Sequence, residues 1–479
     1  MMESLRAENE SLRARIASLE ATAAGVATST STSTSAGSTT LAHSRPMDAT
    51  TADAGDGNSS NKDDDGGGGK NCRSSLGKAG MTAAEIARYS RHLLVPAVGV
   101  NGQRNLLDKT CLVIGAGGLA SAVLPYLAGA GVGHIKVIDF DKASLPTPPA
   151  LQIETGNLHR QVLYREAQVG RSKAQSAAQT MRSINSTVRC TAIEEALNHG
   201  NAMETLSGVD LVVDASDNPR TRYLVNDACV LAGKPLVSGS ALGMEGQVSV
   251  FHHRGGPCYR CVFPTPLAAE AGRRCSDNGV LGTVPGVIGC LQATEALKVL
   301  GEFGCPLAGR LCTYDAQDGS FYTVRLRPRS MACAACGDSP SIKSMRDSEA
   351  FASKHRLTVS RVAPETADVP TASCQEYADV VARGRRHVLL DVRVEVQFAV
   401  CALENAVNIP LAQLEASMHR VETLSEGRSL PVYCVCRRGI DSRAAVAILG
   451  EKHGFPNVVD VSGGLTEWAK SVDPKFPMY

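Results

Sequence analysis

Several features are scarce or missing in the 479-residue sequence. It has no run of 18 or more apolar residues, so we expect no helix that spans a membrane. The first residues, MMESLRAENE, are charged and lack the apolar core of a secretory signal. Aromatic residues make up only 4%, and 49 basic residues balance 48 acidic ones. This balance favours neither a nucleic-acid surface nor a membrane surface, so we expect no such partner.

Cysteine, in contrast, is abundant. The sequence contains sixteen cysteines. In a chain without a recognisable secretory signal, this number indicates metal and thiol chemistry rather than a disulfide framework. We therefore expect a cytoplasmic protein in the reducing environment of the cytosol.

Composition divides the chain into five stretches. Residues 1–24 are typical of a charged helix, either solvated or part of a short coiled coil, because Leu5, Leu12 and Leu19 repeat every seven residues. Residues 25–80 hold Ser/Thr and Asp/Gly tracts that cannot bury enough apolar surface to fold, so we expect disorder. Three stretches follow: a large α/β domain over 81–338, a linker over 339–372, and a smaller α/β domain over 373–479.

Hydrophobic runs alternate with helical patterns in both α/β stretches. In the first, runs at 111–116, 135–140 and 210–216 are typical of buried parallel strands, and 119–130, 173–184 and 221–232 are helical. This alternation predicts a doubly wound, Rossmann-like sheet. In the second, we expect strands at 387–392 and 431–435 and a helix over 442–452.

A glycine-rich motif follows the first predicted strand. Gly115, Gly117 and Gly118 precede a helix in the pattern G-x-G-x-x-A, which lets the backbone approach phosphate at a helix N-terminus. Asp139 ends the next strand, 24 residues after Gly115, where a carboxylate can accept ribose hydroxyls. The motif alone suits NAD, FAD or ATP.

The segments around this motif differ from those of a dehydrogenase. They offer cations for a triphosphate and a carboxylate for Mg²⁺, neither of which a dehydrogenase needs in quantity. The residues concerned are Asn157-Leu158-His159-Arg160, Lys173, Asp217-Asn218 and, upstream, Arg91.

Two C-x-x-C pairs, Cys258–Cys261 and Cys333–Cys336, have the spacing of metal ligands. Each pair can bind one metal from a single tight turn, and the two together close a tetrahedral structural Zn²⁺ site. The alternative is a set of buried or redox-active thiols, because the intervening 71 residues exceed the length of a zinc ribbon.

Cys436 follows a predicted buried strand and precedes a helix. Backbone N–H groups of the turn and of the helix N-terminus are expected to stabilise a thiolate or persulfide there. Cys-dependent phosphatases share this plan but require Cys-x5-Arg. Here the sixth residue after Cys436 is Ser442, and Arg443 is the seventh, which favours a shorter loop sized for sulfur. Cys434 is expected to be core.

Several motifs resemble known families. The MoeB/ThiF family, relatives of ubiquitin-activating enzymes, is matched in order by RYSRHLLVPAVGVNGQ, VIGAGGLAS, NLHRQVL, VGRSKA, DASDNPRTRYLVNDACV, GMEGQVSV, CYRC and GVIGCLQATEALK. Residues 373–479 resemble rhodanese domains through Asp391-Val392-Arg393, Gly463-Gly464-Leu465-Thr466-Glu467-Trp468 and the ending DPKFPMY. The combination is similar to the eukaryotic molybdopterin-synthase sulfurylases, which activate the ubiquitin-related modifier Urm.

The resemblance implies roles for individual residues. The glycines, Asp139 and the 157–160 segment with Lys173 would bind ATP, Asp217 with Asn218 would hold Mg²⁺, and the four paired cysteines would bind Zn²⁺. Arg91 would reach the phosphate site of a partner subunit, which implies a homodimer. Cys275, beside Arg273 and Arg274, would form a glycyl thioester or resolve a persulfide linkage; the alternative is a structural cysteine or one in a mobile loop. About ten residues at 146–155 look inserted relative to the family, as an extra loop or an error in the gene model.

The implied function is sulfur activation. The chain would adenylate the C-terminal glycine of a ubiquitin-like sulfur carrier ending in Gly-Gly. It would then transfer sulfur from a Cys436 persulfide, loaded by a cysteine desulfurase or another donor. The thiocarboxylate product would serve tRNA wobble-uridine 2-thiolation, molybdenum cofactor biosynthesis, or both. Two alternatives are an NAD-dependent oxidoreductase fused to a thiol domain and a non-catalytic modifier-binding scaffold. Arg160, Lys173 and Asp217 count against the first. Intact Cys436, Arg438 and Asp217 count against the second.

Overall fold

The computed structural model describes residues 80–139, 153–264, 279–354 and 369–478. The chain forms two compact units, Met1–Phe351 and Ala352–Tyr479. The predicted N-terminal helix, the low-complexity stretch up to residue 79, Cys275, and residues 146–152 of the predicted insertion lie outside the described residues. Among the helices in the described ranges, none combines the length and hydrophobicity needed to cross a bilayer.

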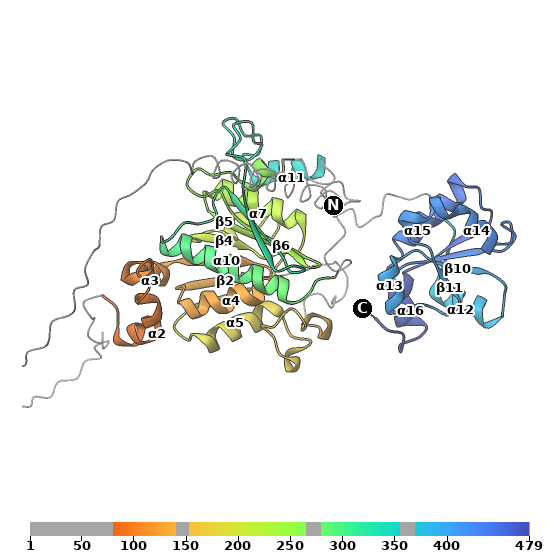
Figure 1. Cartoon of the computed structure of the whole chain (residues 1–479), viewed down its shortest axis with the longest axis horizontal. Coiled ribbons are helices and arrows are strands. Elements are labelled where there is room, and N and C mark those ends of the chain that lie inside the picture. The colour runs from red at the N-terminus through yellow and green to blue at the C-terminus, as the bar shows by residue number, and fades with distance from the viewer. Residues whose placement is uncertain (1–79, 140–152, 265–278, 355–368, 479) are drawn as a thin grey trace, which may run out of the picture. The chain divides into compact units, whose positions relative to one another are not determined.

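An eight-stranded sheet organises the first unit, in the order β3-β2-β1-β4-β5-β6-β7-β8 (Figure 1). Its strands are β1 (Thr110–Ile114), β2 (His134–Ile138), β3 (Arg189–Ile193), β4 (Leu211–Asp214), β5 (Leu236–Leu242), β6 (Glu245–Phe251), β7 (Arg310–Asp315) and β8 (Ser320–Arg325). The first five are parallel, as predicted for a doubly wound fold, and β6 to β8 add an antiparallel half that the sequence pattern did not predict.

Helices cover both faces of this sheet. Helix α7 lies on one face, and α4, α5 and α10 lie on the other (Figure 1). The helices of the unit are α2 (Ala83–Leu93), α3 (Gly99–Asp108), α4 (Ala120–Ala130), α5 (Lys173–Ile184), α6 (Ala202–Thr205), α7 (Pro219–Ala232), α8 (Tyr259–Val262), α10 (Thr283–Gly301) and α11 (Met345–Lys354), with short 3₁₀ turns η2 (Thr155–Asn157) and η3 (Glu166–Gln168).

Local signals explain several of these helix boundaries. Thr82 and Glu85 form a reciprocal capping box at the start of α2. Ser172 caps α5 by accepting a hydrogen bond from the Gln175 amide, so the predicted start of that helix is confirmed. Helix α4 ends at Gly131, whose positive φ of 81° suits a residue without a β-carbon.

The predicted linker differs from the structure in its first half. Helix α11 occupies Met345–Lys354, and Met345 and Ser348 are buried. The sequence shows no clear period there because ten residues make fewer than three helical turns. The segment directly after the second cysteine pair is therefore folded, and the linker prediction over 339–372 does not hold for α11.

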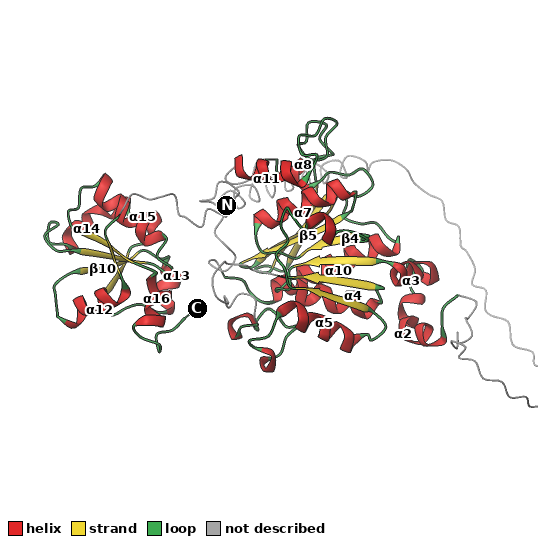
Figure 2. Ribbon diagram, turned by 180° about the vertical axis from the view of Figure 1, so that it is seen from behind, coloured by secondary structure: helices red, strands yellow, loops and turns green. Residues whose placement is uncertain are grey.

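The second unit is a five-stranded parallel sheet in the order β11-β10-β12-β13-β9, with helices on both faces (Figure 2). The predicted helix after Cys436 begins at Asp441 and continues as a π-helix, η7, from Ile448 to Lys452. The elements are β9 (Thr371–Ala372), α12 (Cys374–Ala382), β10 (Val388–Asp391), α13 (Glu395–Val400), β11 (Ala406–Asn408), η5 (Leu411–Gln413), η6 (Glu415–Ser417), α14 (Met418–Leu424), β12 (Val432–Val435), α15 (Asp441–Ala447), β13 (Val458–Val461) and α16 (Gly464–Ser471).

Candidate functional site

The glycine-rich loop connects β1 to α4 at the carboxyl edge of the parallel strands. Gly115 has a φ of 91°, and a β-carbon there would lie 2.9 Å from the carbonyl oxygen of Ala215. A β-carbon at Gly118 would lie 3.2 Å from Pro285. Helix α4 has no side-chain cap at its N-cap residue, Leu119, among the described residues. The loop therefore fits phosphate: a side chain would fill it, and the first amides of α4 are suited to an anion.

Asp139 lies directly beneath this loop. One of its carboxylate oxygens accepts a hydrogen bond of 2.6 Å from the backbone N–H of Ala116. The next strand of a Rossmann-like sheet commonly ends in an acidic residue that binds ribose. The contact with Ala116 brings the carboxylate to the glycine loop.

The segment that contains Asn157 and Arg160 closes over the same edge. The Arg160 guanidinium donates to the Asn157 side-chain oxygen at 2.8 Å and to the Gly156 carbonyl at 3.0 Å. It also contacts His159 Nε2 at 2.7 Å. Burial and the positive charge of Arg160 lower the pKa of His159, which favours a neutral imidazole that accepts this hydrogen bond. The backbone of Arg160 lies beside Gly118, since a β-carbon there would be 3.5 Å from the Arg160 carbonyl oxygen.

Tyr164 joins this segment to the start of α5. Its hydroxyl donates to the Ala116 carbonyl oxygen at 2.7 Å and contacts the Lys173 carbonyl oxygen at 3.3 Å. Burial, followed by the charge of Asp139, raises the pKa of Tyr164, so the phenol remains a donor. Residue Ile153, near the end of the predicted insertion, is buried and exchanges backbone hydrogen bonds with the 170–171 turn. This end of the insertion is therefore integrated into the fold.

Asp214, at the end of β4, is a residue for which sequence reasoning offered no role. It is fully buried and accepts hydrogen bonds from the Ser216 amide at 3.0 Å and the Ser216 hydroxyl at 2.6 Å. Its second oxygen accepts from Ser238 at 3.2 Å and lies 3.5 Å from Arg222 Nε. Asp214 thus fixes the turn that leads to Asp217. The available signal was the first aspartate of the Asp-Ala-Ser-Asp-Asn motif at a strand end.

Beyond this turn, Asp217 and Asn218 have different environments. Asp217 is exposed, so its carboxylate is accessible to a metal ion or a substrate. The Asn218 side chain caps α7 by accepting a hydrogen bond of 2.8 Å from the Thr221 amide. Asn218 therefore has a structural task in addition to the predicted contact with the nucleotide.

Arg91 lies apart from the other predicted nucleotide residues. It is exposed on the last turn of α2, and α2 is tied through His92 and Gln103 to Ala130 at the C-terminal end of α4. The glycine loop is at the opposite end of this helix, about 16 Å away at 1.5 Å per residue. Within one chain, Arg91 is therefore separated from the glycine loop.

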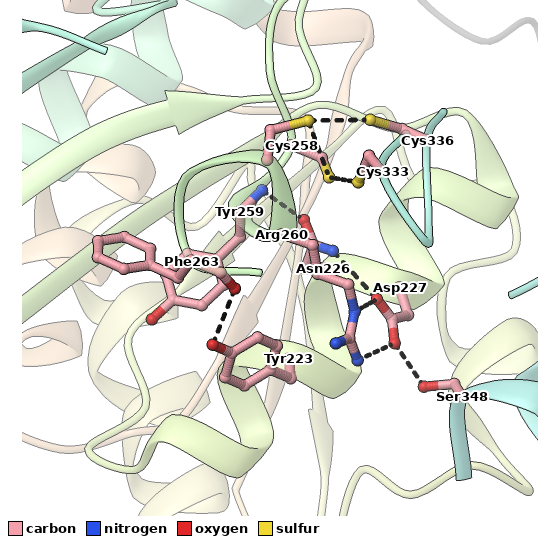
Figure 3. A network of polar contacts seen from close by, with 11 residues as sticks. Tyr223, Asn226, Asp227, Cys258, Tyr259, Arg260, Phe263, Cys333, Cys336 and Ser348 are labelled. Carbon is pink, nitrogen blue, oxygen red and sulfur yellow. Dashed lines mark hydrogen bonds and ion pairs between the residues drawn. The ribbon is translucent and has the colours of Figure 1, made fainter. Parts of the chain in front are cut away.

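The four cysteines of the two C-x-x-C pairs form one cluster (Figure 3). Their sulfur atoms all lie within 4.8 Å of one another, with separations of 3.9 Å between Cys258 and Cys261, 3.6 Å between Cys258 and Cys333, and 3.3 Å between Cys261 and Cys336. Ligands placed about 2.3 Å from a tetrahedral zinc lie about 3.8 Å apart. The cluster therefore fits a metal with four thiolate ligands, in agreement with the predicted residues.

A buried ion pair stands next to this cluster. Arg260, inside the first C-x-x-C pair, donates from Nε and Nη2 to the two carboxylate oxygens of Asp227 at 2.6 and 2.7 Å. Ser348 of α11 donates to the same carboxylate at 2.6 Å (Figure 3). The Arg260 guanidinium packs between the rings of Tyr223 and Phe351, with centroids at 4.7 and 4.4 Å. These contacts hold α11 against the cysteine cluster.

In the second unit, Cys436 begins the loop between β12 and α15. It is 2% exposed, and its sulfur accepts a hydrogen bond of 3.1 Å from the Gly439 amide and lies 3.3 Å from the Ser442 hydroxyl. The Gly439 amide suits an anionic sulfur such as that of a persulfide, and the Ser442 hydroxyl can either donate a hydrogen bond to the sulfur or accept one from its thiol. Cys434 is fully buried in the core, as expected, and burial, followed by Asp460 and Cys436, raises its pKa.

Two glycines hold the Cys436 loop from the other side. Gly464 has a φ of 60°, and a β-carbon there would lie 2.3 Å from the Cys436 carbonyl oxygen. Gly463 also approaches Gly439 closely, because a β-carbon at Gly439 would lie 2.6 Å from the Gly463 amide nitrogen. The amide of Leu465 then donates to the Cys436 carbonyl at 2.9 Å. The Gly463-Gly464 motif thus serves as backbone packing for the loop.

The Asp391-Val392-Arg393 motif forms a buried ion pair at the end of β10, next to β12. Arg393 is 2% exposed, and its guanidinium donates to both Asp391 carboxylate oxygens at 2.5 to 3.0 Å. It also donates to the carbonyl oxygens of Gln397 and Cys401 at 3.1 and 2.7 Å. The pair therefore anchors α13 and the segment after it to the sheet.

The first unit is a Rossmann-like domain with a glycine-rich loop, and the second is a small α/β domain with a cysteine loop. Both match known protein families. Residues 89–335 match the ThiF family and residues 373–471 match the rhodanese-like domain, and the chain belongs to the ThiF family. The adenylyltransferase and sulfurtransferase MOCS3 of Arabidopsis thaliana is 45% identical, covering 84% of this chain and 87% of that protein. The protein of the same name from Mus musculus is 43% identical, covering 84% of this chain and 89% of that protein. The crystal structure of E. coli MccB with MccA-N7isoASN is 23% identical with a TM-score of 0.47, over 55% of this chain and 76% of that one.

Proposed function

We propose that this chain adenylates the C-terminal glycine of a ubiquitin-like sulfur carrier and then converts it to a thiocarboxylate with sulfur carried on Cys436. The observation that carries the proposal is the presence, in one chain, of a phosphate-fitting glycine loop and a sulfur loop whose amide and hydroxyl face Cys436. The names of the relatives, which join the two activities, support it.

The adenylation step requires groups that stabilise negative charge on the phosphates. The carboxylate of the carrier attacks the α-phosphorus of ATP, an O–P bond forms, and pyrophosphate leaves with the electron pair of the broken P–O bond. We assign Arg160 and Lys173 to the charge that develops on the phosphates, with Asn157 and Asp139 on the ribose. Leu158 and His159 belong to the same segment, in which His159 orients the Arg160 guanidinium.

Two metals accompany this assignment. Asp217, with Asn218 beside it, would hold Mg²⁺, which neutralises charge on the departing pyrophosphate. Zn²⁺ fits the four-cysteine cluster, and four protein ligands would leave it no open position, so its role is structural. Asp227, which accepts hydrogen bonds from both Arg260 and Ser348, would link this structural metal to the folding of α11.

The sulfur step uses the second unit. The terminal sulfur of the Cys436 persulfide attacks the carbonyl carbon of the acyl-adenylate, a C–S bond forms, and AMP leaves. A thiol then attacks the Cys436 sulfur of the acyl disulfide, which releases the thiocarboxylate and leaves a disulfide for an external thiol to reduce. We assign this resolving role, or an earlier glycyl thioester, to Cys275 on its sequence context alone.

Partners and location complete the proposal. The carrier ends in Gly-Gly, and a cysteine desulfurase or another donor supplies the sulfur. The product serves tRNA wobble-uridine 2-thiolation, molybdenum cofactor biosynthesis, or both. We propose a homodimer, because Arg91 lies far from the glycine loop of its own chain, and a cytosolic location, which suits the fourteen described cysteines that all have free thiols.

The decisive experiment is ATP–pyrophosphate exchange with the purified full chain. We expect exchange that requires Mg²⁺ and a carrier protein ending in Gly-Gly, and no exchange with a carrier that lacks the last glycine. A failure to exchange with any carrier of this class would contradict the proposal. NAD reduction without exchange would instead support the oxidoreductase alternative.

A further inference from the structure

A buried carboxylate that the mechanism above does not use lies beneath the Cys436 loop. Asp460, on β13, is completely buried, and neither of its carboxylate oxygens has a hydrogen-bond partner among the described residues. An unpaired buried carboxylate costs several kcal/mol of folding free energy in principle, so its retention calls for a physical reason.

Register places Asp460 next to the sulfur chemistry. Strand β13 pairs in parallel with β12 so that Asp460 faces Cys434, two residues before Cys436. Side chains two residues apart on a strand point to the same face, and Cys434 and Cys436 belong to one core cluster. Helix α15 covers that cluster with Ser442, which is also completely buried.

Ser442 connects the two groups. Its hydroxyl lies 3.3 Å from the Cys436 sulfur, and the same hydroxyl is the first of the groups that favour the charged form of Asp460. A serine hydroxyl can accept one hydrogen bond while it donates another, so it can pass a proton between neighbours. Ser442 thus contacts the reactive sulfur and influences the charge of Asp460. No hydrogen bond joins its hydroxyl to Asp460 in this structure, so proton transfer requires the hydroxyl to turn toward the carboxylate.

The surroundings of Asp460 suit a proton acceptor. From α15, Arg443 favours its charged form, whereas burial, the larger effect, raises the pKa of Asp460. The thiol of Cys434 on β12 faces Asp460, and the thiol of Cys374 on α12 lies close enough to feel its charge. Burial, Glu467 and Asp460 together raise the pKa of Cys374 to about 11, so both of these thiols hold their protons. On the remaining side, Thr371 of β9 does not titrate.

We propose that Asp460 is a positioning residue that takes up, through Ser442, the proton that Cys436 loses when it accepts sulfur. This inference rests on the proposed role of Cys436 as the persulfide carrier. Because Cys436 is 2% exposed, few water molecules contact its sulfur near neutral pH, and an internal acceptor provides the faster path for its proton.

The step balances with thiosulfate as the sulfur donor. The Cys436 sulfur attacks the outer sulfur of thiosulfate, one S–S bond forms, the S–S bond of thiosulfate breaks, and sulfite leaves with its electron pair. The thiol proton moves to the Ser442 oxygen as the Ser442 proton moves to Asp460. When cyanide then removes the outer sulfur as thiocyanate, the proton returns to Cys436 by the reverse path.

The test is the pH profile of thiosulfate:cyanide sulfur transfer, measured with the full chain and its Asp460→Asn variant. Asparagine has the shape of aspartate but cannot accept a proton, so we expect kcat/KM to fall about 100-fold near neutral pH. We expect recovery toward the wild-type value in alkaline solution, where hydroxide removes the thiol proton instead. In the wild type, activity should be lost as the pH falls, at a pH higher than the ordinary pKa of aspartate. A carboxyl with a raised pKa is already protonated at that pH and cannot accept a second proton.

Controls separate this proposal from simpler explanations. Ser442→Ala should reproduce the Asp460→Asn profile, and the double variant should be no worse than the poorer single variant, because both changes break one path. Glu451→Gln, an exposed change on the same helical segment, should leave the profile unchanged. A loss that is equal at all pH values, or no loss, would overturn the relay. Sulfur transfer by a Cys436→Ala variant would instead overturn the underlying role of Cys436.

Discussion

The two candidate sites are assembled in different ways. The nucleotide site draws on five separate segments between Gly115 and Asn218, joined by contacts such as Ala116 with Asp139 and Tyr164. The sulfur site is one continuous strand, loop and helix, closed by the Gly463-Gly464 turn. A site of the first kind requires the whole sheet to form, whereas a site of the second kind depends mainly on one βα connection.

The largest effects should come from two variants that each lose one activity and keep the other. Cys436→Ala should abolish sulfur transfer from thiosulfate and leave ATP–pyrophosphate exchange intact, because the nucleotide residues lie in another folded unit. Asp217→Ala should lower exchange by about 10²- to 10³-fold and leave transfer from thiosulfate intact. Both assays on both variants check this. If Cys436→Ala lost exchange, the assignment of the two activities to two units would be wrong.

Removal of the metal should affect one unit strongly and the other hardly at all. Treatment with a strong chelator, or a Cys258→Ser change, should lower the melting temperature of the first unit by on the order of 10 °C, because structural zinc contributes directly to folding. Calorimetry with two transitions checks this, with Cys305→Ser, at an exposed cysteine outside the cluster, as the control. Equal shifts in both transitions, or stoichiometric binding without any shift, would contradict a structural role.

A smaller effect should follow from filling the space behind the sulfur loop. Gly464→Ala places a β-carbon against the Cys436 carbonyl at a residue with a φ of 60°. We expect a loss of about 1–3 kcal/mol in the free energy of unfolding of the second unit, with reduced sulfur transfer. Gly450→Ala is the matched control, since a β-carbon there meets nothing within 4 Å. Urea denaturation and the sulfur-transfer assay measure both, and a tolerated Gly464→Ala would mean that the loop is not held from this side.

Sequence reasoning predicted the local features of both sites well. The start of α5 at Lys173, the loop after Cys436 and the glycine loop each have a signature within a few residues, namely a helical pattern, a strand–turn–helix pattern and paired glycines. It missed the antiparallel strands β6 to β8, whose partners are set by hairpin pairing rather than by periodicity. It also missed α11, which is stabilised by Ser348 on Asp227 and by Phe351 on Arg260.

The sequence by itself determined the two α/β units, the glycine-rich turn, the two C-x-x-C pairs and the strand, loop and helix around Cys436, because each depends on spacing along the chain. The tertiary structure alone decided which distant side chains meet. It placed Asp214 under the Asp217 turn and the four sulfurs within 4.8 Å, and it separated Arg91 from the glycine loop of its own chain. It also placed Asp460 opposite Cys434, two residues before Cys436, because strand register, and not spacing in the sequence, determines what a buried carboxylate faces.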